Sequence, residues 1–210
     1  MKKTIAISLI IIAVSFAVAF CFYSKMPGLM ASHWNSKGEV DGYMPQFWGL
    51  FLMPLVSLGM FLLFVFIPRI DPLKKNIRKF IGYYHGFIVV MLSFLLYIYL
   101  LTIFWNLGFS FNMTRLLLPA LAVLFYYVGV MVSHAKRNWF IGIRTPWTLS
   151  SDRVWEKTHR VGGRLFKYSS AIIFLGLFFD QYAILFILVP VLGTALYTVV
   201  YSYFEFKKLG

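Results

Sequence analysis

The sequence predicts an all-α membrane protein with six transmembrane helices. Of its 210 residues, 60% are hydrophobic and only 13% are charged, and the mean hydropathy is +0.78. A soluble domain of average composition is far more polar. Six apolar runs are close to the length of about 20 residues that a helix needs to cross a hydrocarbon core of about 30 Å. A β-barrel is excluded because its strands would alternate apolar and polar residues, whereas runs such as GMFLLFVFI are apolar at every position.

The six expected spans are residues 4–23, 47–67, 81–104, 116–132, 165–179 and 182–204. The first run follows Lys2 and Lys3 and contains Ala17-Val18-Ala19, which resembles a signal-peptide cleavage site. We interpret it as a retained span. The fifth run is short, so we expect that helix either to tilt little or to extend at its ends.

The distribution of positive charge predicts the orientation. The net charge is +13, and 17 of the 20 lysines and arginines fall on the side that carries both termini. Lys25, Lys37 and Arg115 fall on the other side. The positive-inside rule therefore predicts a multi-pass protein of the cell membrane with both termini in the cytoplasm. This topology accounts for the basic composition without direct nucleic-acid binding, and attraction to anionic membrane lipids follows from it.

Two loops are long enough to carry function, an outer one at 24–45 and an inner one at 133–164. Each follows the first span of a group of three. The chain is therefore expected to form an N-terminal half, residues 1–104, and a C-terminal half, residues 105–210, with inverted topology as in several transporter folds.

The predicted membrane interior is nearly free of charge. Only Lys167 and His85 are ionisable there, and both lie near the inner edge. Carriers usually keep ionisable groups inside the bundle. Pro54, Pro119 and Pro190 are able to kink their helices and shape a cavity. A small-molecule or peptide transporter that uses a cavity between the two halves is thus the alternative rather than the preferred interpretation.

The outer loop has the turn signals of a small hairpin, at Asn35 to Gly38 and at Asp41-Gly42. Its candidate contact residues are His33, Trp34, Asn35, Gly38 and Asp41. His33, Glu39 and Asp41 match no established metal-ligand spacing, so no metal is expected there.

The inner loop combines a turn with an amphipathic helix. Pro146 follows Arg144-Thr145 and fixes the turn, and Ser151 and Asp152 are suited to a helix start. We expect the helix to lie in the membrane interface. One face holds Val154, Trp155, Thr158, Val161, Gly162 and Leu165, which would point toward lipid or bundle, and the other holds Arg153, Glu156, Lys157, Arg160 and Arg164. Arg144 is expected to bond helix-end carbonyls or an acidic group, and Trp147 and Trp155 to anchor the loop at the interface.

Catalysis is not indicated. The sequence lacks a nucleophile elbow, a His-Glu-x-x-His pair and a glycine-rich phosphate loop. His85, His134 and His159 are all on the inner side, with Glu156 one turn before His159. Scattered groups of this kind are usual in solvated loops, so we predict neither an enzyme nor a cofactor.

The inner string from Asn138 to Trp155 resembles the signature of the SdpI family of bacterial membrane proteins. Its quoted residues are Asn138, Ile141-Gly142, Arg144-Thr145-Pro146-Trp147-Thr148 and Val154-Trp155. Pro27, His33-Trp34-Asn35, Gly38 and Asp41-Gly42 of the outer loop resemble the module often found before it. The resemblance implies an immunity protein that protects against a secreted peptide toxin outside and holds a transcriptional repressor at the membrane from inside.

Overall fold

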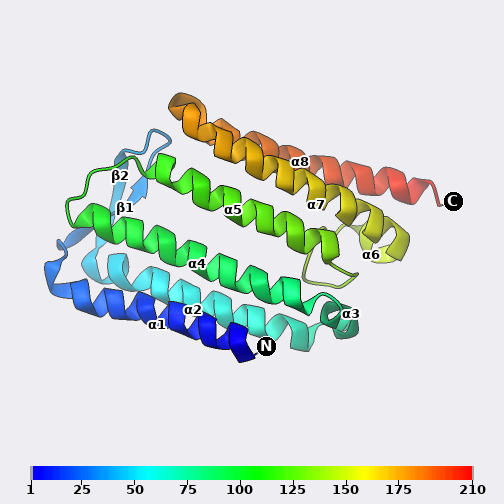
Figure 1. The fold of residues 1–210 in the computed structure, drawn as a ribbon, viewed down its shortest axis with the longest axis horizontal. Coiled ribbons are helices and arrows are strands. Elements are labelled where there is room, and N and C mark those ends of the chain that lie inside the picture. Colours follow the sequence, from blue (N-terminus) through cyan, green and yellow to red (C-terminus); the bar gives the residue numbers. More distant parts are fainter. Residues whose placement is uncertain (1, 210) are drawn as a thin grey trace.

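Six long helices build the protein, and each is long and apolar enough to cross a membrane. The computed structural model describes residues 2–209. The helices are α1 (Lys2–Phe22), α2 (Gln46–Ile70), α4 (Ile81–Asn106), α5 (Met113–His134), α7 (Asp152–Leu175) and α8 (Ala183–Lys207). They run side by side along the long axis of the molecule (Figure 1). The predicted all-α membrane fold with six spans is confirmed.

The fifth span differs most from its prediction. Residues 165–179 were expected to form it alone, after a separate helix in the membrane interface, but α7 is one helix from Asp152 to Leu175. Ser151 caps its start by accepting a hydrogen bond from the Val154 amide, and no proline follows to break it. The predicted amphipathic face is correct, since Val154, Trp155, Thr158 and Gly162 are buried. The predicted separation from the span is wrong.

Short elements connect the helices. They are β1 (Leu29–Trp34), β2 (Val40–Pro45), α3 (Lys74–Arg78), α6 (Pro146–Ser150) and the 3-10 helices η1 (Tyr23–Lys25), η2 (Gly176–Phe178) and η3 (Asp180–Tyr182). The two strands form the expected antiparallel hairpin, with Met30 opposite Met44 and an irregularity between Ala31 and His33.

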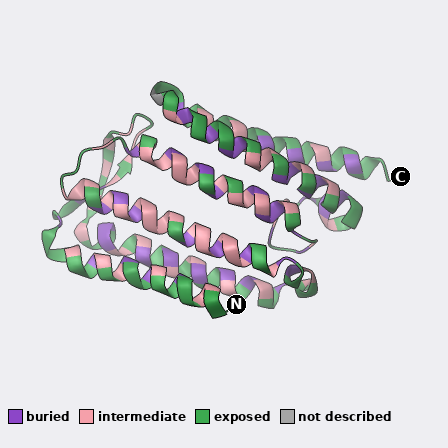
Figure 2. Cartoon of the chain, in the orientation of Figure 1, coloured by how far each residue is buried: buried purple, intermediate pink, exposed green. Residues whose placement is uncertain are grey.

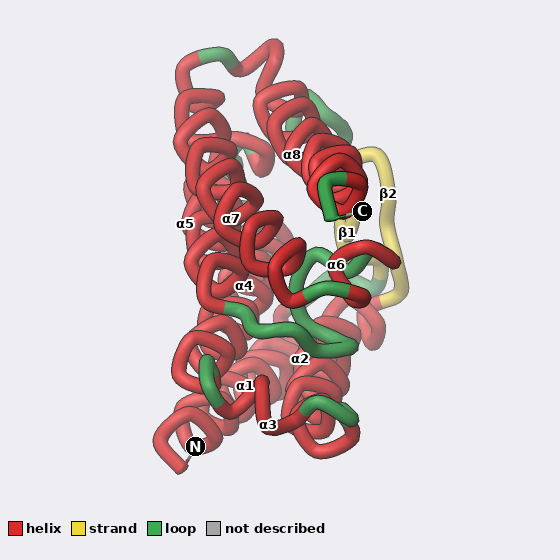
Figure 3. Tube along the Cα trace, turned by 90° about the vertical axis from the view of Figure 1, so that its right-hand side faces the viewer, coloured by secondary structure: helices red, strands yellow, loops and turns green. Residues whose placement is uncertain are grey.

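The bundle has two chemically different ends. The hairpin lies at one end, which we call the hairpin end; α3, α6 and both chain termini lie at the other, which we call the signature-loop end (Figures 1 and 3). The connection from α5 to α7, residues 135–151, is the signature loop and includes α6. Most of the 17 positive residues assigned to the inner side lie in or next to α3, the signature loop, the first turns of α7 and the two chain ends, and Arg164 and Lys167 lie farther along α7.

The helices bury apolar side chains in three groups. One core lies among α1, α2 and α4 and reaches the signature loop, with Phe61, Tyr84 and Trp155 among its members. A second lies near the hairpin and includes Met30 and Tyr99. A third lies among α5, α7 and α8 around Leu118 and Ile173. Exposed residues occur along all six long helices (Figure 2). Many of them are large and apolar, among them Val123, Val189 and Leu196, each more than 60% exposed. Such a surface suits contact with lipid chains rather than water.

Helices α5 and α7 approach each other through glycines. A Cβ atom on Gly163 would lie 2.0 Å from Ser133 Oγ and 2.8 Å from the Gly129 carbonyl oxygen. A Cβ atom on Gly129 would lie 2.6 Å from the Gly163 carbonyl oxygen. The two backbones therefore touch directly, as in other small-residue crossings of membrane helices.

Candidate functional site

Asn138 organises the first part of the signature loop. Its side chain is fully buried. Nδ2 donates to the carbonyls of Lys136 and Ile141, both at 2.8 Å, and Oδ1 accepts from the amides of Phe140 at 2.9 Å and Ile141 at 2.6 Å. Each polar atom of the amide thus has two partners, which is its full capacity. Asn138 holds the turn closed from within.

A buried pair of stacked rings supports the middle of the loop. Trp155 and His159, one turn apart on α7, have ring centroids 3.9 Å apart. The Trp155 indole donates to the carbonyl of Ala135, the C-cap of α5, at 2.8 Å. His159 Nε2 accepts from the Ile143 amide at 3.0 Å, so Nδ1 carries the proton and donates to the Trp155 carbonyl at 2.8 Å. The ring is neutral in this arrangement, with both nitrogens occupied.

Trp155 is therefore not an interface anchor, which corrects the expectation for this residue. Only 1% of it is exposed, and it belongs to the core shared with α1, α2 and α4. The Trp155 indole N–H donates to a helix-end carbonyl inside the protein, so this polar group is hydrogen-bonded without contact with the membrane surface.

Gly142 is the position where the loop passes over these rings. Its φ is +115°, and a Cβ atom there would lie 2.4 Å from His159 Nε2. An alanine would be strained in this backbone conformation and would also push the histidine away from the Ile143 amide.

We expect Gly142→Ala to lower the free energy of unfolding by at least about 2 kcal/mol, the sum of backbone strain and displaced packing. Thermal unfolding of the purified protein in detergent measures this. Gly28→Ala is the matched control, because Gly28 also lies outside the helices but has open space where its Cβ would be. Equal melting temperatures for the two variants would contradict the assignment.

Thr145 and Pro146 start the short helix α6, where the sequence predicts only a turn. Thr145 Oγ1 accepts from the Thr148 amide, and Thr148 Oγ1 accepts from the Thr145 amide, so the two side chains form a reciprocal cap. Pro146 occupies the first turn, where its missing N–H costs nothing. Thr145 Oγ1 is also 3.0 Å from Ser202 Oγ on α8, which ties the cap to the last span.

Arg144 and Trp147 hold the surface of the loop. Arg144 Nη1 donates to the Trp139 carbonyl at 2.7 Å, so it does fix the turn, but its acceptor is in the loop and not at a helix end. The Trp147 ring packs edge-on against Tyr203 of α8, with centroids 5.2 Å apart. All seven predicted residues of the signature thus lie together at one end of the bundle.

Residues that the sequence did not single out connect this loop to the other helices. Asp71, 1% exposed, accepts from the Trp139 amide at 2.9 Å and from the Leu73 amide at 2.6 Å. Asn76 Nδ2 donates to the Arg137 carbonyl at 2.9 Å. Asp71 is the single acidic residue in the basic run RIDPLKKNIRKF, and this contrast in charge is the sequence signal that marks it.

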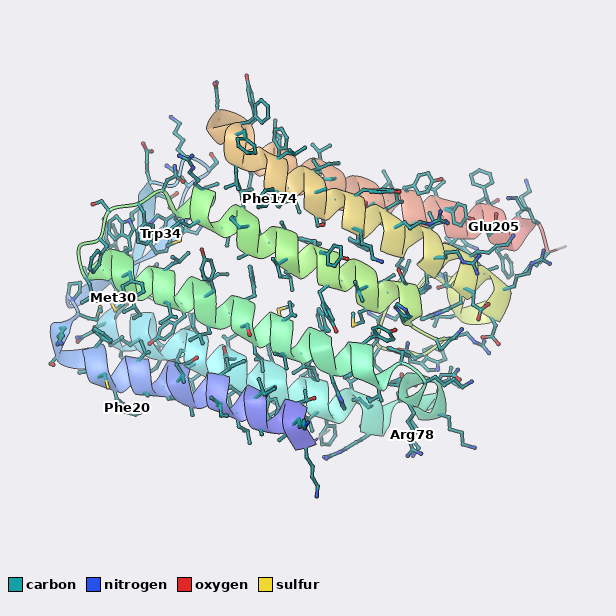
Figure 4. All side chains as sticks on the ribbon, viewed as in Figure 1. Phe20, Met30, Trp34, Arg78, Phe174 and Glu205 are labelled. Carbon is teal, nitrogen blue, oxygen red and sulfur yellow. The ribbon has the colours of Figure 1, made fainter. Side chains whose placement is uncertain are left out.

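Glu205, near the end of α8, is a further unrecognised member. Its carboxylate is 2.5 Å from Lys157 Nζ on α7 and 2.6 Å from Lys208 Nζ, and only 6% of its side chain is exposed. Figure 4 shows it at the signature-loop end. Hydrogen bonding to Glu205 raises the pKa of Lys208. The ion pairs of Glu205 with Lys157 and Lys208 join the end of α8 to the charged half of α7.

Hydrogen bonds hold the signature loop in one backbone arrangement. Asn138 and His159 in the loop interior bond backbone groups through all their side-chain polar atoms, so neither ring nitrogen of His159 is free to act as a base. Among residues 2–209 no group of three or more His, Cys, Asp or Glu side chains is placed to hold a metal ion. The exposed side chains at this end are mostly lysines and arginines, so it presents positive charge.

At the hairpin end, the predicted residues form a polar turn. His33 Nδ1 and Asp41 Oδ1 are 2.5 Å apart. Asn35 Oδ1 accepts from the amides of Lys37 and Glu39. Gly38 has φ +80° and lies against Asn112, whose Nδ2 donates to the Lys37 carbonyl at 3.0 Å. This last contact fixes the turn to the start of α5.

A pocket of about 270 Å³ lies beneath the hairpin, between α2, α4 and α5. Its wall is aromatic and rich in methionine, including Trp34, Trp48, Met44, Met53 and Met113, with Ser32, Thr102 and Thr114 as polar members. Flexible, polarisable side chains of this kind adapt to ligands of different shape. The buried Nε1 of Trp34 has no acceptor among the residues that the structure describes, and Figure 4 shows Trp34 at this end of α5.

Helix α5 connects both regions. Met113, Thr114 and Leu117 in its first turns line the pocket, and the carbonyl of Ala135 after its last turn receives the Trp155 indole. A displacement of α5 would therefore change the pocket at one end and the contact with Trp155 at the other.

These features define a multi-pass helical membrane protein whose specific groups lie at its two ends, in a hairpin over a pocket and in a hydrogen-bonded loop. Residues 134–202 match the SdpI/YfhL protein family, and residues 10–58 match a domain of unknown function, DUF1648. Over 211 aligned residues, covering 100% of this chain and 99% of the relative, the chain is 28% identical to "Immunity protein SdpI" of Bacillus subtilis (strain 168). The chain is therefore similar to the SdpI family in its C-terminal half and to an SdpI protein along its whole length. No solved structure matches it significantly.

Proposed function

We propose that this protein is a membrane immunity protein that protects its cell against a secreted peptide toxin. The full-length similarity to an immunity protein carries this proposal. With most of the 20 lysines and arginines at the signature-loop end or next to it, the positive-inside rule directs the hairpin end outward, where a secreted toxin arrives.

The pocket beneath the hairpin is the proposed toxin contact. A hydrophobic peptide side chain fits its aromatic and methionine wall. The Trp34 ring is part of this wall and offers aromatic surface to such a side chain. His33, Asn35, Gly38 and Asp41 shape the hairpin above the opening.

The signature-loop end is the proposed contact for a cytosolic partner, in the family's signalling role a transcriptional repressor. For the toxin to promote that contact, it must favour one of two arrangements of the protein. Helix α5 is the element that both regions share, and we assign the coupling to it.

Protection of toxin-sensitive cells tests the function. Cells that produce this protein should survive a secreted peptide toxin that kills cells without it. Trp34→Ala should reduce the protective effect at least about tenfold in toxin dose, because it removes an aromatic side chain from the pocket wall. Tyr182→Ala is the control, since this aromatic residue is 51% exposed and lies outside the pocket.

Membrane levels of each variant are measured alongside, so that loss of protein is not taken for loss of protection. Full protection by Trp34→Ala at normal levels would remove the pocket from the proposal. Solute movement into liposomes that contain the purified protein, without protection of cells, would replace immunity with transport.

A further inference from the structure

The exposed face of α7 carries a regular row of positive charge. Its residues are Arg153, Lys157, Arg160, Arg164 and Lys167, at alternating intervals of four and three. This spacing keeps all five side chains on one side of a helix. We call this row the basic stripe.

Four members of the basic stripe are free of carboxylate partners. Lys157 is bound to Glu205, but the three arginines and Lys167 form no ion pair with any side chain that the structure describes. Arg153, Arg160 and Arg164 are exposed, and Lys167 is half-buried. Their charge is available to an anion from outside the chain.

The same face becomes apolar toward the hairpin end. Beyond Lys167 the residues on this side of the helix are Ala171, Leu175 and, in η2, Phe178; the last two are 50% and 72% exposed. Arg164 and Phe178 are separated by about 21 Å along a helix, less than the hydrocarbon thickness of about 30 Å. The backbone of Arg164 thus lies at membrane depth, and its long side chain reaches outward to the headgroup level.

A groove continues from the basic stripe toward the membrane centre. It lies between α7 and α8, has a volume of about 300 Å³ and is lined by Leu165, Tyr168, Ile172, Pro190, Gly193 and Tyr197, among others. Tyr168, which lines the groove, follows Arg164 by four residues and therefore lies on the same side of α7, one turn closer to the hairpin end.

We propose that this surface is a binding site for an anionic phospholipid. Arg160 and Arg164 bind the phosphate, because guanidinium groups match phosphate oxygens with paired hydrogen bonds. The groove takes one acyl chain. An acidic soluble partner fits less well because the basic stripe continues into exposed apolar residues of the same membrane-spanning helix, Ala171, Leu175 and Phe178, which lipid covers and a soluble protein does not.

Native mass spectrometry of the purified full-length protein tests the site with dioleoyl phosphatidylglycerol and dioleoyl phosphatidylcholine as competing probes. We expect several-fold preferential retention of phosphatidylglycerol. Arg160→Gln with Arg164→Gln should lower it by about fivefold for each arginine, the effect of about 1 kcal/mol per basic residue near an anionic membrane surface. Lys74→Gln with Lys75→Gln removes the same charge from exposed positions of α3 and should change it less than about twofold.

The groove is tested separately. Gly193→Leu should fill it without a clash, because no atom lies within 4 Å of the position of its Cβ. We expect weaker phosphatidylglycerol binding and an unchanged melting temperature. Equal loss in the arginine and lysine double variants would overturn the headgroup site, as would displacement of the lipid by inorganic phosphate or by a polyglutamate peptide. Unchanged binding in Gly193→Leu would overturn the acyl site.

Discussion

Replacing Gly163 with leucine is expected to prevent the close approach of α5 and α7 and to cost at least about 3 kcal/mol of stability. Even the first added carbon would lie 2.0 Å from Ser133 Oγ and 2.8 Å from a backbone oxygen of Gly129. The backbone cannot withdraw as a flexible side chain would, so the helices must separate. The yield of folded protein and the apparent melting temperature in detergent report the effect.

Gly59→Leu in α2 is the matched control. Gly59 is exposed, and no atom lies within 4 Å of its added Cβ. A leucine there meets lipid or detergent and should leave the melting temperature nearly unchanged. If both variants behaved alike, the direct backbone contact between α5 and α7 would be refuted.

Trp155→Ala is the second substitution for which we expect a large loss, about 3–5 kcal/mol. It empties the largest fully buried side-chain volume, leaves the Ala135 carbonyl without its donor and removes the ring that stacks on His159. Trp155→Phe retains most of the volume but not the donor, and should lose about 1–3 kcal/mol. Unfolding in a denaturant or by heat ranks the two variants.

Trp139→Ala provides the comparison at the same end of the bundle. Trp139 is 51% exposed, and it acts in the loop through its backbone amide and carbonyl, which an alanine retains. We expect a change within about 0.5 kcal/mol, as for most surface substitutions. A Trp155→Ala variant as stable as Trp139→Ala would show that the stacked rings do not support the loop.

The helices were predictable because a membrane imposes one simple requirement, a long uncharged run, on each of them. The hairpin followed from local turn chemistry at Asn35, Gly38 and Gly42. In the signature loop, Ser151 correctly marked where α7 begins, whereas the turn expected at Pro146 is the start of the short helix α6. Each of these features is encoded within a few neighbouring residues.

The failures concern contacts between distant segments. Trp155 looked like an interface anchor because tryptophan is common there, and only the fold reveals the Ala135 carbonyl that its indole reaches. The bond from the Trp139 amide to Asp71 joins residues 68 positions apart. No periodicity in a single sequence specifies such a pairing. The first half of α7 was also assigned to a separate helix, because its charged turns differ in composition from the apolar turns that follow.

The unbroken course of α7 has a mechanical meaning. A rod of 24 residues is about 36 Å long, so a tilt of roughly ten degrees at one tip displaces the other by roughly 6 Å. A partner that binds the cationic turns of α7 in the headgroup layer would therefore also move the opposite tip of this helix, near the hairpin end. The helix has no break that would absorb the motion.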